Sequence, residues 1–396
     1  MASVSFDIYQ TLAIAVVAVI VGRLAKKYIR VLERFCIPAP VIGGIIVAVI
    51  VCILHETGTA QVAFDSTLRD VCMVFFFTTI GFQADFKLLR TGGKSLGIFL
   101  ILVLVLVILQ NTVAIGAAAV FGMDKLLGLC TGSIPMTGGH GTSVAFGPIL
   151  EEHGLAGASS VCIASATYGL TAGSVIGGPI ANSLIVKKNL LSTVSTEDPY
   201  KDSALVRSTH EGQIGYSIAA FQIAIAAGIG TAFSLLLSKT GMTFPMYIGA
   251  MISAAVIRNI GELTGKLDIN MEKITDIGEI MLPLFLGIAM ITMNVYVLLQ
   301  LALPLAVLLL IQTVLIMIYA RYVVFNLMGA DYDAAVITAG FCGFGMGATP
   351  NAMANMHAVC LKYEPSFKAF LLVPIVGSVF ADFINSTVIT LFLNFF

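Results

Sequence analysis

Two glycine-broken stretches, SIPMTGGHGT at 133–142 and GFCGFGMGATP at 340–350, decide the fold of this chain. Each lies inside an apolar segment, about 126–150 and 333–357, that is a poor candidate for a simple spanning helix. Glycine lets the backbone turn sharply and approach a ligand closely. At membrane depth, irregular backbone is tolerated only inside protein or along a water-filled cavity. If the chain spans a membrane, the two stretches predict re-entrant loops whose tips meet near its middle.

Composition places the chain in a membrane. Of its 396 residues, 58% are hydrophobic and 11% are charged, whereas roughly 25% are charged in soluble domains. This balance excludes a soluble enzyme, a disordered chain and a nucleic-acid binder, and the net charge of -1 leaves no basic surface for phosphates. The seven cysteines form no CxxC pair and no metal-like spacing, so neither a disulfide framework nor a zinc site is indicated. We expect a polytopic integral membrane protein.

Ten long apolar segments are candidate membrane spans. A spanning helix needs about 20 apolar residues, and the alternating polarity of a lipid-facing barrel is missing. The predicted fold class is therefore an all-α polytopic membrane protein. No cleavable signal peptide is apparent, so the first span is expected to remain. The predicted spans are 8–25, 37–54, 71–86, 96–121, 156–186, 213–238, 244–260, 276–296, 299–320 and 369–396.

Basic residues indicate the orientation of these spans, because Lys and Arg accumulate in cytoplasmic loops. If both glycine-broken stretches re-enter rather than cross, 18 of the 21 basic residues fall on one side. The other side then holds only Arg69, Lys125 and Lys239. Both termini are therefore predicted to lie outside, and the central loop 187–212 in the cytoplasm.

The two halves of the chain resemble each other at a constant offset. Thr131 matches Thr338 and Gly138 matches Gly345, both 207 residues later. Each half has five spans and one glycine-broken stretch, and an odd number of spans places the halves in opposite orientations. Inverted repeats of this kind are typical of secondary transporters. The predicted divisions are an N-terminal repeat 1–186 with its re-entrant loop at about 126–150, a cytoplasmic linker 187–212, and a C-terminal repeat 213–396 with its loop at about 333–357.

Paired glycine-broken segments are the best sequence indication of a binding site in such proteins. A loop tip that leads into a short helix exposes free N–H groups, and these groups and the helix dipole favour an anion. The alternative is close helix packing, for which membrane helices also use small residues. The predicted substrate-binding residues are Ser133, Thr137, Gly138, Gly139, His140, Gly141, Thr142, Gly343, Gly345, Gly347, Thr349 and Asn351.

Side-chain oxygens are candidate ligands of a small cation, because turned carbonyls and hydroxyls are hard ligands suited to sodium. Asp382 lies within the last span, where a buried carboxylate is costly and a functional candidate; the alternative is a place at the water boundary. Threonine hydroxyls also bond commonly to their own helix. The predicted sodium ligands are Thr78, Thr79, Ser143, Asp382 and Asn385, with Thr292 and Asn294 as further candidates for a cavity wall.

Polar side chains within apolar surroundings leave further alternatives open. His140 is the sole histidine of the first stretch, and it could donate to a carboxylate, relay a proton or satisfy loop carbonyls. Gln110, Asn111 and Gln312 lie in the middle of long Leu/Val/Ile spans, where interhelical hydrogen bonds are expected. Those spans fit a lipid-facing scaffold or a subunit contact.

Six short elements of the sequence carry a family resemblance. They are Ile37-Pro-Ala-Pro-Val-Ile-Gly-Gly44, Thr79-Ile-Gly81, Gly138-Gly-His-Gly-Thr142, Gly177-Gly-Pro179, Asp331-Tyr-Asp-Ala-Ala335 and Cys342-Gly-Phe-Gly-Met-Gly-Ala-Thr-Pro350. With these elements the chain resembles the sodium/glutamate symporter family, and the likeness runs over nearly the whole chain. The resemblance implies sodium-coupled uptake of L-glutamate across a bacterial cytoplasmic membrane, with sodium as the coupling ion and no cofactor. It also implies two inverted five-helix repeats, each with a re-entrant loop, a homodimer, and elevator-like movement of a core against a scaffold.

The leading hypothesis is therefore a secondary symporter for an acidic amino acid. One alternative is a sodium- or proton-coupled transporter of another small carboxylate. Another is a channel, although two unlike loops make a poor ring of equivalent carbonyls. A membrane enzyme could use Asp382 with His140 as an acid/base pair, but no nucleophile motif accompanies them. The sequence contains no P-loop, so primary pumping is not expected.

Overall fold

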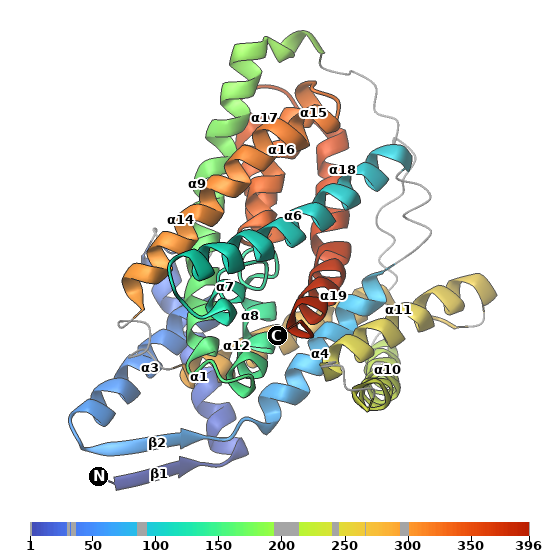
Figure 1. The fold of residues 1–396 in the computed structure, drawn as a ribbon. Coiled ribbons are helices and arrows are strands. Elements are labelled where there is room, and N and C mark those ends of the chain that lie inside the picture. Colours follow the sequence, from blue (N-terminus) through green and yellow to red (C-terminus); the bar gives the residue numbers. More distant parts are fainter. Residues whose placement is uncertain are drawn as a thin grey trace.

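The fold was taken from a computed structural model of the chain, which describes residues 2–29, 32, 37–84, 93–193, 214–239, 245–265, 267–293 and 301–395. The described residues are almost entirely helical (Figure 1). The elements of the first half are β1 (Ala2–Phe6), α1 (Ile8–Tyr28), α3 (Ala39–Glu56), β2 (Ala60–Phe64), α4 (Thr67–Gln83), α6 (Gly93–Val120), α7 (Lys125–Leu129), α8 (Gly139–Glu152), α9 (Ala158–Lys188) and a 3-10 turn η1 (Leu190–Thr193).

The second half follows the same order of helices. Its long apolar helix α14 runs on through a π-helical turn, and its last helix is interrupted by another. The elements are α10 (Ile214–Ser238), α11 (Met246–Thr264), α12 (Met271–Ile291), α14 (Ala302–Ile318), the π turn η2 (Tyr319–Val324), α15 (Phe325–Leu327), α16 (Tyr332–Gly345), α17 (Thr349–Lys362), α18 (Phe367–Ile375), the π turn η3 (Val376–Phe380) and α19 (Ala381–Leu393).

All ten predicted spans contain helix, and the helical fold class is confirmed for the described residues. Seven helices there are long and apolar enough to cross a membrane: α1, α3, α6, α9, α10, α12 and the helix through α14 and η2. The other three predicted spans do not reach that standard. Helix α4 has 17 residues, α11 carries the ion pair of Arg258 with Glu262, and the last span is divided into α18 and α19.

Within the described residues, a small parallel sheet departs from the expected all-helical chain. Strands β1 and β2 pair in register from Ala2 opposite Ala60 to Phe6 opposite Phe64, and the two phenylalanine rings stack 5.4 Å apart. Residues 60–64 alternate between half-buried and exposed, which is the pattern of a strand. The span-based prediction missed the pair because five residues are too few to appear in a search for apolar segments.

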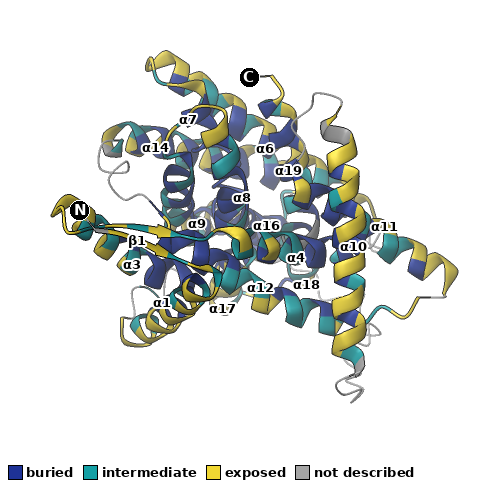
Figure 2. Cartoon of the chain, turned by 90° about the horizontal axis from the view of Figure 1, so that it is seen from below, coloured by how far each residue is buried: buried dark blue, intermediate teal, exposed yellow. Residues whose placement is uncertain are grey.

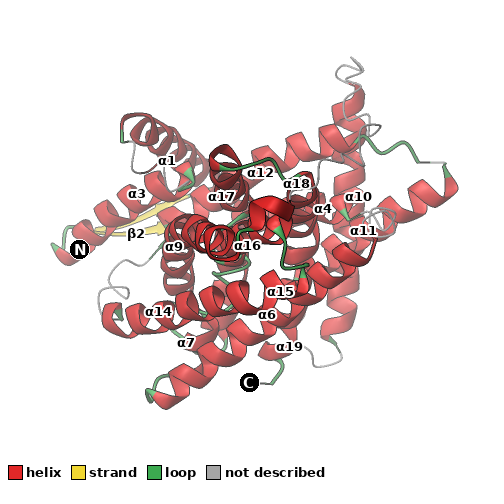
Figure 3. Ribbon diagram, turned by 90° about the horizontal axis from the view of Figure 1, so that it is seen from above, coloured by secondary structure: helices red, strands yellow, loops and turns green. Residues whose placement is uncertain are grey.

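The helices form two bundles, with many contacts inside each and few between them. The first, here called the wall bundle, comprises α1, α3, α4, α10, α11 and α12, which are the first three spans of each half. The second, the hairpin bundle, comprises α6–α9 and α14–α19 (Figure 3). Buried residues concentrate on α8, α9 and α16, whereas α1 and α10 are exposed along much of their length (Figure 2). Large exposed apolar side chains such as Phe221 and Ile225 fit contact with lipid.

Candidate functional site

Each glycine-broken stretch folds as a helix, a turn and a second helix. The first is α7, a turn over 130–138, and α8; the second is α16, a short turn over 346–348, and α17. The two turns touch. Gly139 has φ of 61°, which an L side chain rarely adopts, and a Cβ there would lie 2.7 Å from the carbonyl oxygen of Gly347. Glycine is therefore required where the first turn passes the second.

Side-chain amides from α6 support both turns. Gln110 donates to the carbonyl of Gly345 (2.7 Å) and accepts from the hydroxyl of Thr137 (2.7 Å), so one side chain holds both turns. Asn111 accepts from the backbone N–H of Ser133 (2.8 Å), and Gln312 of α14 donates to the carbonyl of Gln110 (2.8 Å). All three amides are fully buried. The expected interhelical bonds are confirmed, and they reach the turns. The two apolar helices thus belong to the hairpin bundle.

Asparagines from the other helices complete the support. Asn385 of α19 donates to the carbonyl of Ser133 (3.0 Å), while Asn351 of α17 donates to the carbonyl of Leu170 (2.8 Å). A Cβ on Gly138 would lie 2.5 Å from the Asn385 amide nitrogen. The backbone of the first turn is thereby fixed against α19, and that of the second helix pair against α9.

The first helix of each pair, α7 or α16, has a side-chain N-cap, whereas the second helix, α8 or α17, has none. Asp124 accepts from the N–H of Leu126 at the start of α7, and Asp331 accepts from the N–H of Ala334 at the start of α16. Helices α8 and α17 follow the N-cap residues Gly138 and Ala348, which provide no side-chain cap. The first three N–H groups of α8 have no partner within the described residues. In the first turn of α17, Pro350 has no N–H and the N–H of Asn351 donates to the carbonyl of Ala348 (3.0 Å), so the N–H of Thr349 is the open one there. The partial positive charge of a helix N-terminus favours an anion.

Both uncapped N-termini line one cavity of about 510 Å³. Its opposite side is the wall bundle, which contributes apolar side chains such as Phe76, Phe77 and Leu286. Helix α8 meets that wall closely, since a Cβ on Gly141 would lie 3.6 Å from the ring of Phe76. The charged residues among those lining the cavity are both acidic, Asp382 of α19 and Glu279 of α12. No Lys or Arg appears there, so within the described part of the chain an anion meets amides and hydroxyls.

Most of the predicted substrate residues line this cavity, together with one predicted sodium ligand, Asp382. Ser133, Gly343 and Gly345 lie behind the lining, where the backbone of Ser133 and Gly345 accepts the bonds described above and Gly343 packs on the start of α17. The predicted residues that line it are Thr137, Gly138, Gly139, His140, Gly141, Thr142, Gly347, Thr349, Asn351 and Asp382.

Unpartnered oxygens gather around the first turn. The buried hydroxyls of Ser133 and Thr142 and the amide oxygen of Asn385 have no hydrogen-bond partner within the described residues, and neither does the hydroxyl of Ser386. The carboxylate of Asp382, one helical turn from both α19 residues, also has no ion pair there. Buried polar atoms are rarely left unpaired. Neutral oxygens beside one carboxylate are a donor set that suits an alkali cation.

Three predicted sodium ligands point elsewhere. The hydroxyls of Thr78 and Thr79 donate to the carbonyls of Val74 and Phe76 in their own helix, at 2.6 and 2.7 Å. Ser143 donates to the carbonyl of Cys162 (3.2 Å). Thr292 likewise bonds within its helix end, and Asn294 lies outside the described residues. Their role as ligands stays a prediction that these bonds do not favour.

His140 faces both the cavity and α9. Its Nε2 lies 2.9 Å from the hydroxyl of Thr167, and the side chain is 6% exposed. The hydroxyl of Thr167 itself donates to the carbonyl of Ile163 (3.1 Å). A hydroxyl that donates there accepts from the ring, so Nε2–H is the donor and Nδ1 is the acceptor in the neutral ring. The orientation of the ring is therefore fixed by α9.

Sequence reasoning did not find several residues of this site. Glu279 lies near a span end, so it carried no signal of its own. Tyr247 of α11 is fully buried, lies beside Ser386 and Asp382, and has an unpartnered hydroxyl. It comes from the other bundle, which no local pattern could have indicated.

A helical membrane chain in which two helix pairs, each broken by a turn, meet at one cavity has the construction of a membrane transport protein. Comparison with known proteins gives the same class and a family. The model of the sodium/glutamate symporter family matches residues 4–365. The chain therefore belongs to the sodium/glutamate symporter family, as its motifs indicated, and its curated relatives are named as symporters rather than enzymes.

Relatives from bacteria match nearly the whole length of the chain. The sodium/glutamate symporters of Escherichia coli (strain K12) and Shigella flexneri are each 37% identical over 392 residues, which is 98% of this chain and 97% of the relative. The sodium/glutamate symporter of Haemophilus influenzae is 35% identical over 399 residues, with the same coverage.

Proposed function

We propose that this protein takes up L-glutamate across the bacterial cytoplasmic membrane by symport with sodium. The observation that carries the proposal is the convergence of two uncapped helix N-termini, from α8 and α17, on one cavity beside an unpaired carboxylate. L-glutamate has two carboxylates: the open N–H groups at the start of α8 can receive one, and the N–H and hydroxyl of Thr349 at the start of α17 can receive the other. The relatives' names, which specify sodium and glutamate, support this substrate.

The cation site in this proposal lies between the first turn and α19. Asp382 supplies the negative charge, and Ser133, Thr142, Asn385 and Ser386 supply neutral oxygens that lack partners in the described chain. Sodium fits such a set because it binds hard oxygen ligands without a fixed geometry.

Charge repulsion couples the two ligands. Two negative charges about 7 Å apart repel by about 2 kcal/mol at an effective dielectric constant near 20, which weakens binding roughly 30-fold. An anionic substrate in the cavity therefore binds poorly while Asp382 is uncompensated, and sodium at Asp382 removes the penalty. By linkage, glutamate raises the affinity for sodium by the same factor.

Alternating access in this proposal is a displacement of the hairpin bundle along the wall bundle. The sparse contacts between the bundles and the apolar wall along α4 and α12 support a sliding interface. The cavity lies towards the ends of α3, α4 and α12 that the basic residues assign to the cytoplasm, through Pro38, Gln83 and Glu279. In this proposal the cavity faces the cytoplasm, both termini lie outside and loop 187–212 lies inside.

Inverted repeats and re-entrant hairpins complete the proposed architecture. Their support is the matching order of helices in the two halves and the matching Asp caps, Asp124 and Asp331, which stand 207 residues apart. Figure 1 shows α7 and α8 in the lower part of the molecule and α16 and α17 in the upper part. A homodimer is proposed on the family resemblance alone.

Labelled L-glutamate uptake into proteoliposomes tests the function. Purified protein is given an inward sodium gradient or, in parallel, only a proton gradient, with protein-free liposomes as the control. Accumulation that requires sodium is expected. Competition by D-glutamate and other dicarboxylates then ranks the substrates. Absence of accumulation under either gradient, with folded protein, would reject sodium-coupled glutamate transport.

A further inference from the structure

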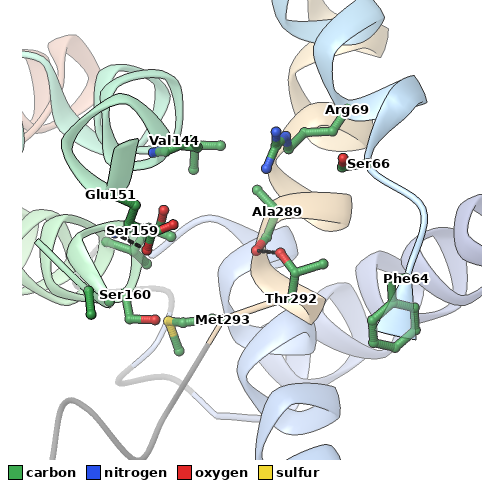
Figure 4. A pocket seen from close by; sticks show the side chains of 14 residues that line it. Phe64, Ser66, Arg69, Val144, Glu151, Ser159, Ser160, Ala289, Thr292 and Met293 are labelled. Carbon is green, nitrogen blue, oxygen red and sulfur yellow. Dashed lines mark hydrogen bonds between the residues drawn. The ribbon is translucent and has the colours of Figure 1, made fainter. Parts of the chain in front are cut away.

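A second cavity of about 540 Å³ lies between the wall bundle and the hairpin bundle, at the end of their interface opposite the cavity at the two turns. The wall bundle contributes Arg69 near the start of α4 and Thr292 beyond the end of α12. The hairpin bundle contributes Glu151 at the end of α8 and Ser159 at the start of α9 (Figure 4). The basic residues place this end of the molecule outside. We call it the outer cavity, and the cavity at the two turns the inner cavity.

Arg69 is the basic residue among those lining the outer cavity. Figure 4 shows its guanidinium reaching from α4 into the space in front of α8. Its Nε and one terminal nitrogen contact a single oxygen of Asp70, at 3.0 and 2.9 Å. The other terminal nitrogen has no partner within the described residues. The Arg69 side chain is 20% exposed and that of Asp70 is 46% exposed, so water screens the acid more than the guanidinium.

The acid of the outer cavity is already engaged. Glu151 accepts from the backbone N–H of Ser159 (3.1 Å), so its carboxylate is held against the start of α9. The outer cavity therefore presents a guanidinium with one free donor on the wall bundle, facing a carboxylate that is held on the hairpin bundle. The charged residues that line the inner cavity are Glu279 and Asp382, both acidic. On the wall bundle, α4 thus carries the basic group of the outer cavity, and α12 carries an acid, Glu279, at the inner cavity.

The spacing between Arg69 and Phe76 along α4 gives the distance from Arg69 to the proposed substrate site. The start of α8 now lies beside Phe76, where a Cβ on Gly141 would be 3.6 Å from the ring. Arg69 is seven residues from Phe76, which is about 10 Å of helix at 1.5 Å per residue. A displacement of the hairpin bundle by that length brings the uncapped N-terminus of α8 next to the guanidinium.

We propose that the outer cavity is an encounter site for the anionic substrate, in which Arg69 attracts a carboxylate and passes it to the N-terminus of α8. This inference rests on the proposed uptake of glutamate and on its orientation. An exposed positive charge at a cleft raises the rate of association with an anion, and the gain falls as salt screens it. Arg69 thus favours capture outside, and Glu279 disfavours rebinding inside.

Glutamate uptake into cells that express the protein tests the encounter site, because such uptake reports only the outer side. At fixed sodium, Arg69→Gln is expected to raise KM roughly tenfold with the maximal rate unchanged, and Arg69→Lys to restore most of the affinity. Added choline chloride should raise KM of the unmodified protein and leave that of Arg69→Gln almost unchanged.

The matched control is Asp70→Asn, which breaks the same ion pair but keeps the charge of Arg69. Its KM is expected to be equal to or lower than that of the unmodified protein. If Asp70→Asn raises KM as Arg69→Gln does, or if Arg69→Gln has a normal KM, the encounter site is wrong while the transport function stands. If the unmodified protein shows no sodium-dependent uptake, the proposed function fails first.

Discussion

The two turns that meet in the hairpin bundle differ in length and in chemistry. The first spans residues 130–138 and is surrounded by oxygens without partners, on Ser133, Thr142 and Asn385. The second spans only 346–348, and the unpartnered oxygen beside it is that of Asn351. Both lead into an uncapped helix. The comparison teaches that the two halves share a helix start without a side-chain cap, whereas the unpartnered oxygens proposed to bind a cation gather at the first turn.

The largest expected effect is the loss of uptake when a side chain is introduced into either turn. It tests whether both turns are needed for transport. A Cβ would lie 2.5 Å from the side chain of Thr142 at Gly138 and 2.6 Å from Ile316 at Gly345. Gly138→Val and Gly345→Val are both expected to abolish uptake while the protein still reaches the membrane. Gly116→Val is the control, because nothing lies within 4 Å of a Cβ there. Normal uptake by either variant of the turns would exclude that turn from the site.

Neutralising Asp382 tests whether the cation binds at the first turn, as proposed. Glutamate binding to purified protein, measured by calorimetry with and without sodium, should improve roughly 30-fold with sodium in the unmodified protein. In Asp382→Asn the repulsion is gone, so sodium is expected to improve binding only a few-fold. Glu152→Gln, an exposed acid at the end of α8, provides the control. An unchanged sodium effect in Asp382→Asn would remove Asp382 from the cation site.

A change at the second turn is expected to affect the substrate alone. Asn351→Ala removes an amide that lines the inner cavity and bonds to Leu170. We expect KM for glutamate to rise about tenfold, because a lost bond to a charged group costs about 1.5 kcal/mol. The sodium concentration for half-maximal uptake should not move. If Asn351→Ala changes both KM for glutamate and the sodium concentration for half-maximal uptake, the second turn does not act on the substrate alone and the proposed assignment is wrong.

Removing the support of His140 has a smaller effect on the first turn. Thr167→Val deletes the hydroxyl that bonds Nε2, and the loss of about 1 kcal/mol corresponds to a roughly fivefold rise in KM. Thr171→Val serves as the control, since that hydroxyl bonds only to the carbonyl of Thr167 within the described residues. Equal effects from the two substitutions would mean that the ring does not contribute to binding through this bond.

The smallest effect is expected from the long apolar helices. Gln312→Leu deletes one bond to the carbonyl of Gln110, and its own oxygen has no partner in the described chain. Uptake should persist, with a thermal unfolding midpoint lower by a few degrees at most. Gln110→Leu should lower both the midpoint and the uptake, because that side chain holds both turns. If Gln312→Leu and Gln110→Leu lowered uptake equally, Gln110 would have no special role in holding the two turns.

Features of this molecule that depend on neighbouring residues can be predicted from the sequence, whereas contacts between distant segments cannot. The spans and the two interrupted stretches are local, so apolar runs and glycine spacing located them. The caps are also local: Asp124 and Asp331 are strong N-cap residues, whereas Gly138 and Ala348 leave an end open. A carboxylate in a span, Asp382, is costly enough to be singled out on its own.

Features that join distant segments could not be predicted. Gln110 and Gly345 are 235 residues apart, and nothing near either residue indicates the other. Tyr247 meets the candidate cation site only because α11 packs on α19. The division into two bundles follows from which apolar faces pack together, and helices that are apolar all round do not show this in their sequence.

The parallel pair of β1 and β2 has a consequence for biogenesis. The first strand is synthesised before any helix, but its partner follows only after α1 and α3, near residue 60. Two strands can pair only when they lie on the same side of the bilayer. If one of the two helices crosses the bilayer and the other does not, the strands end on opposite sides and stay unpaired. The pairing of β1 with β2 therefore requires α1 and α3 to insert together, as one helical hairpin.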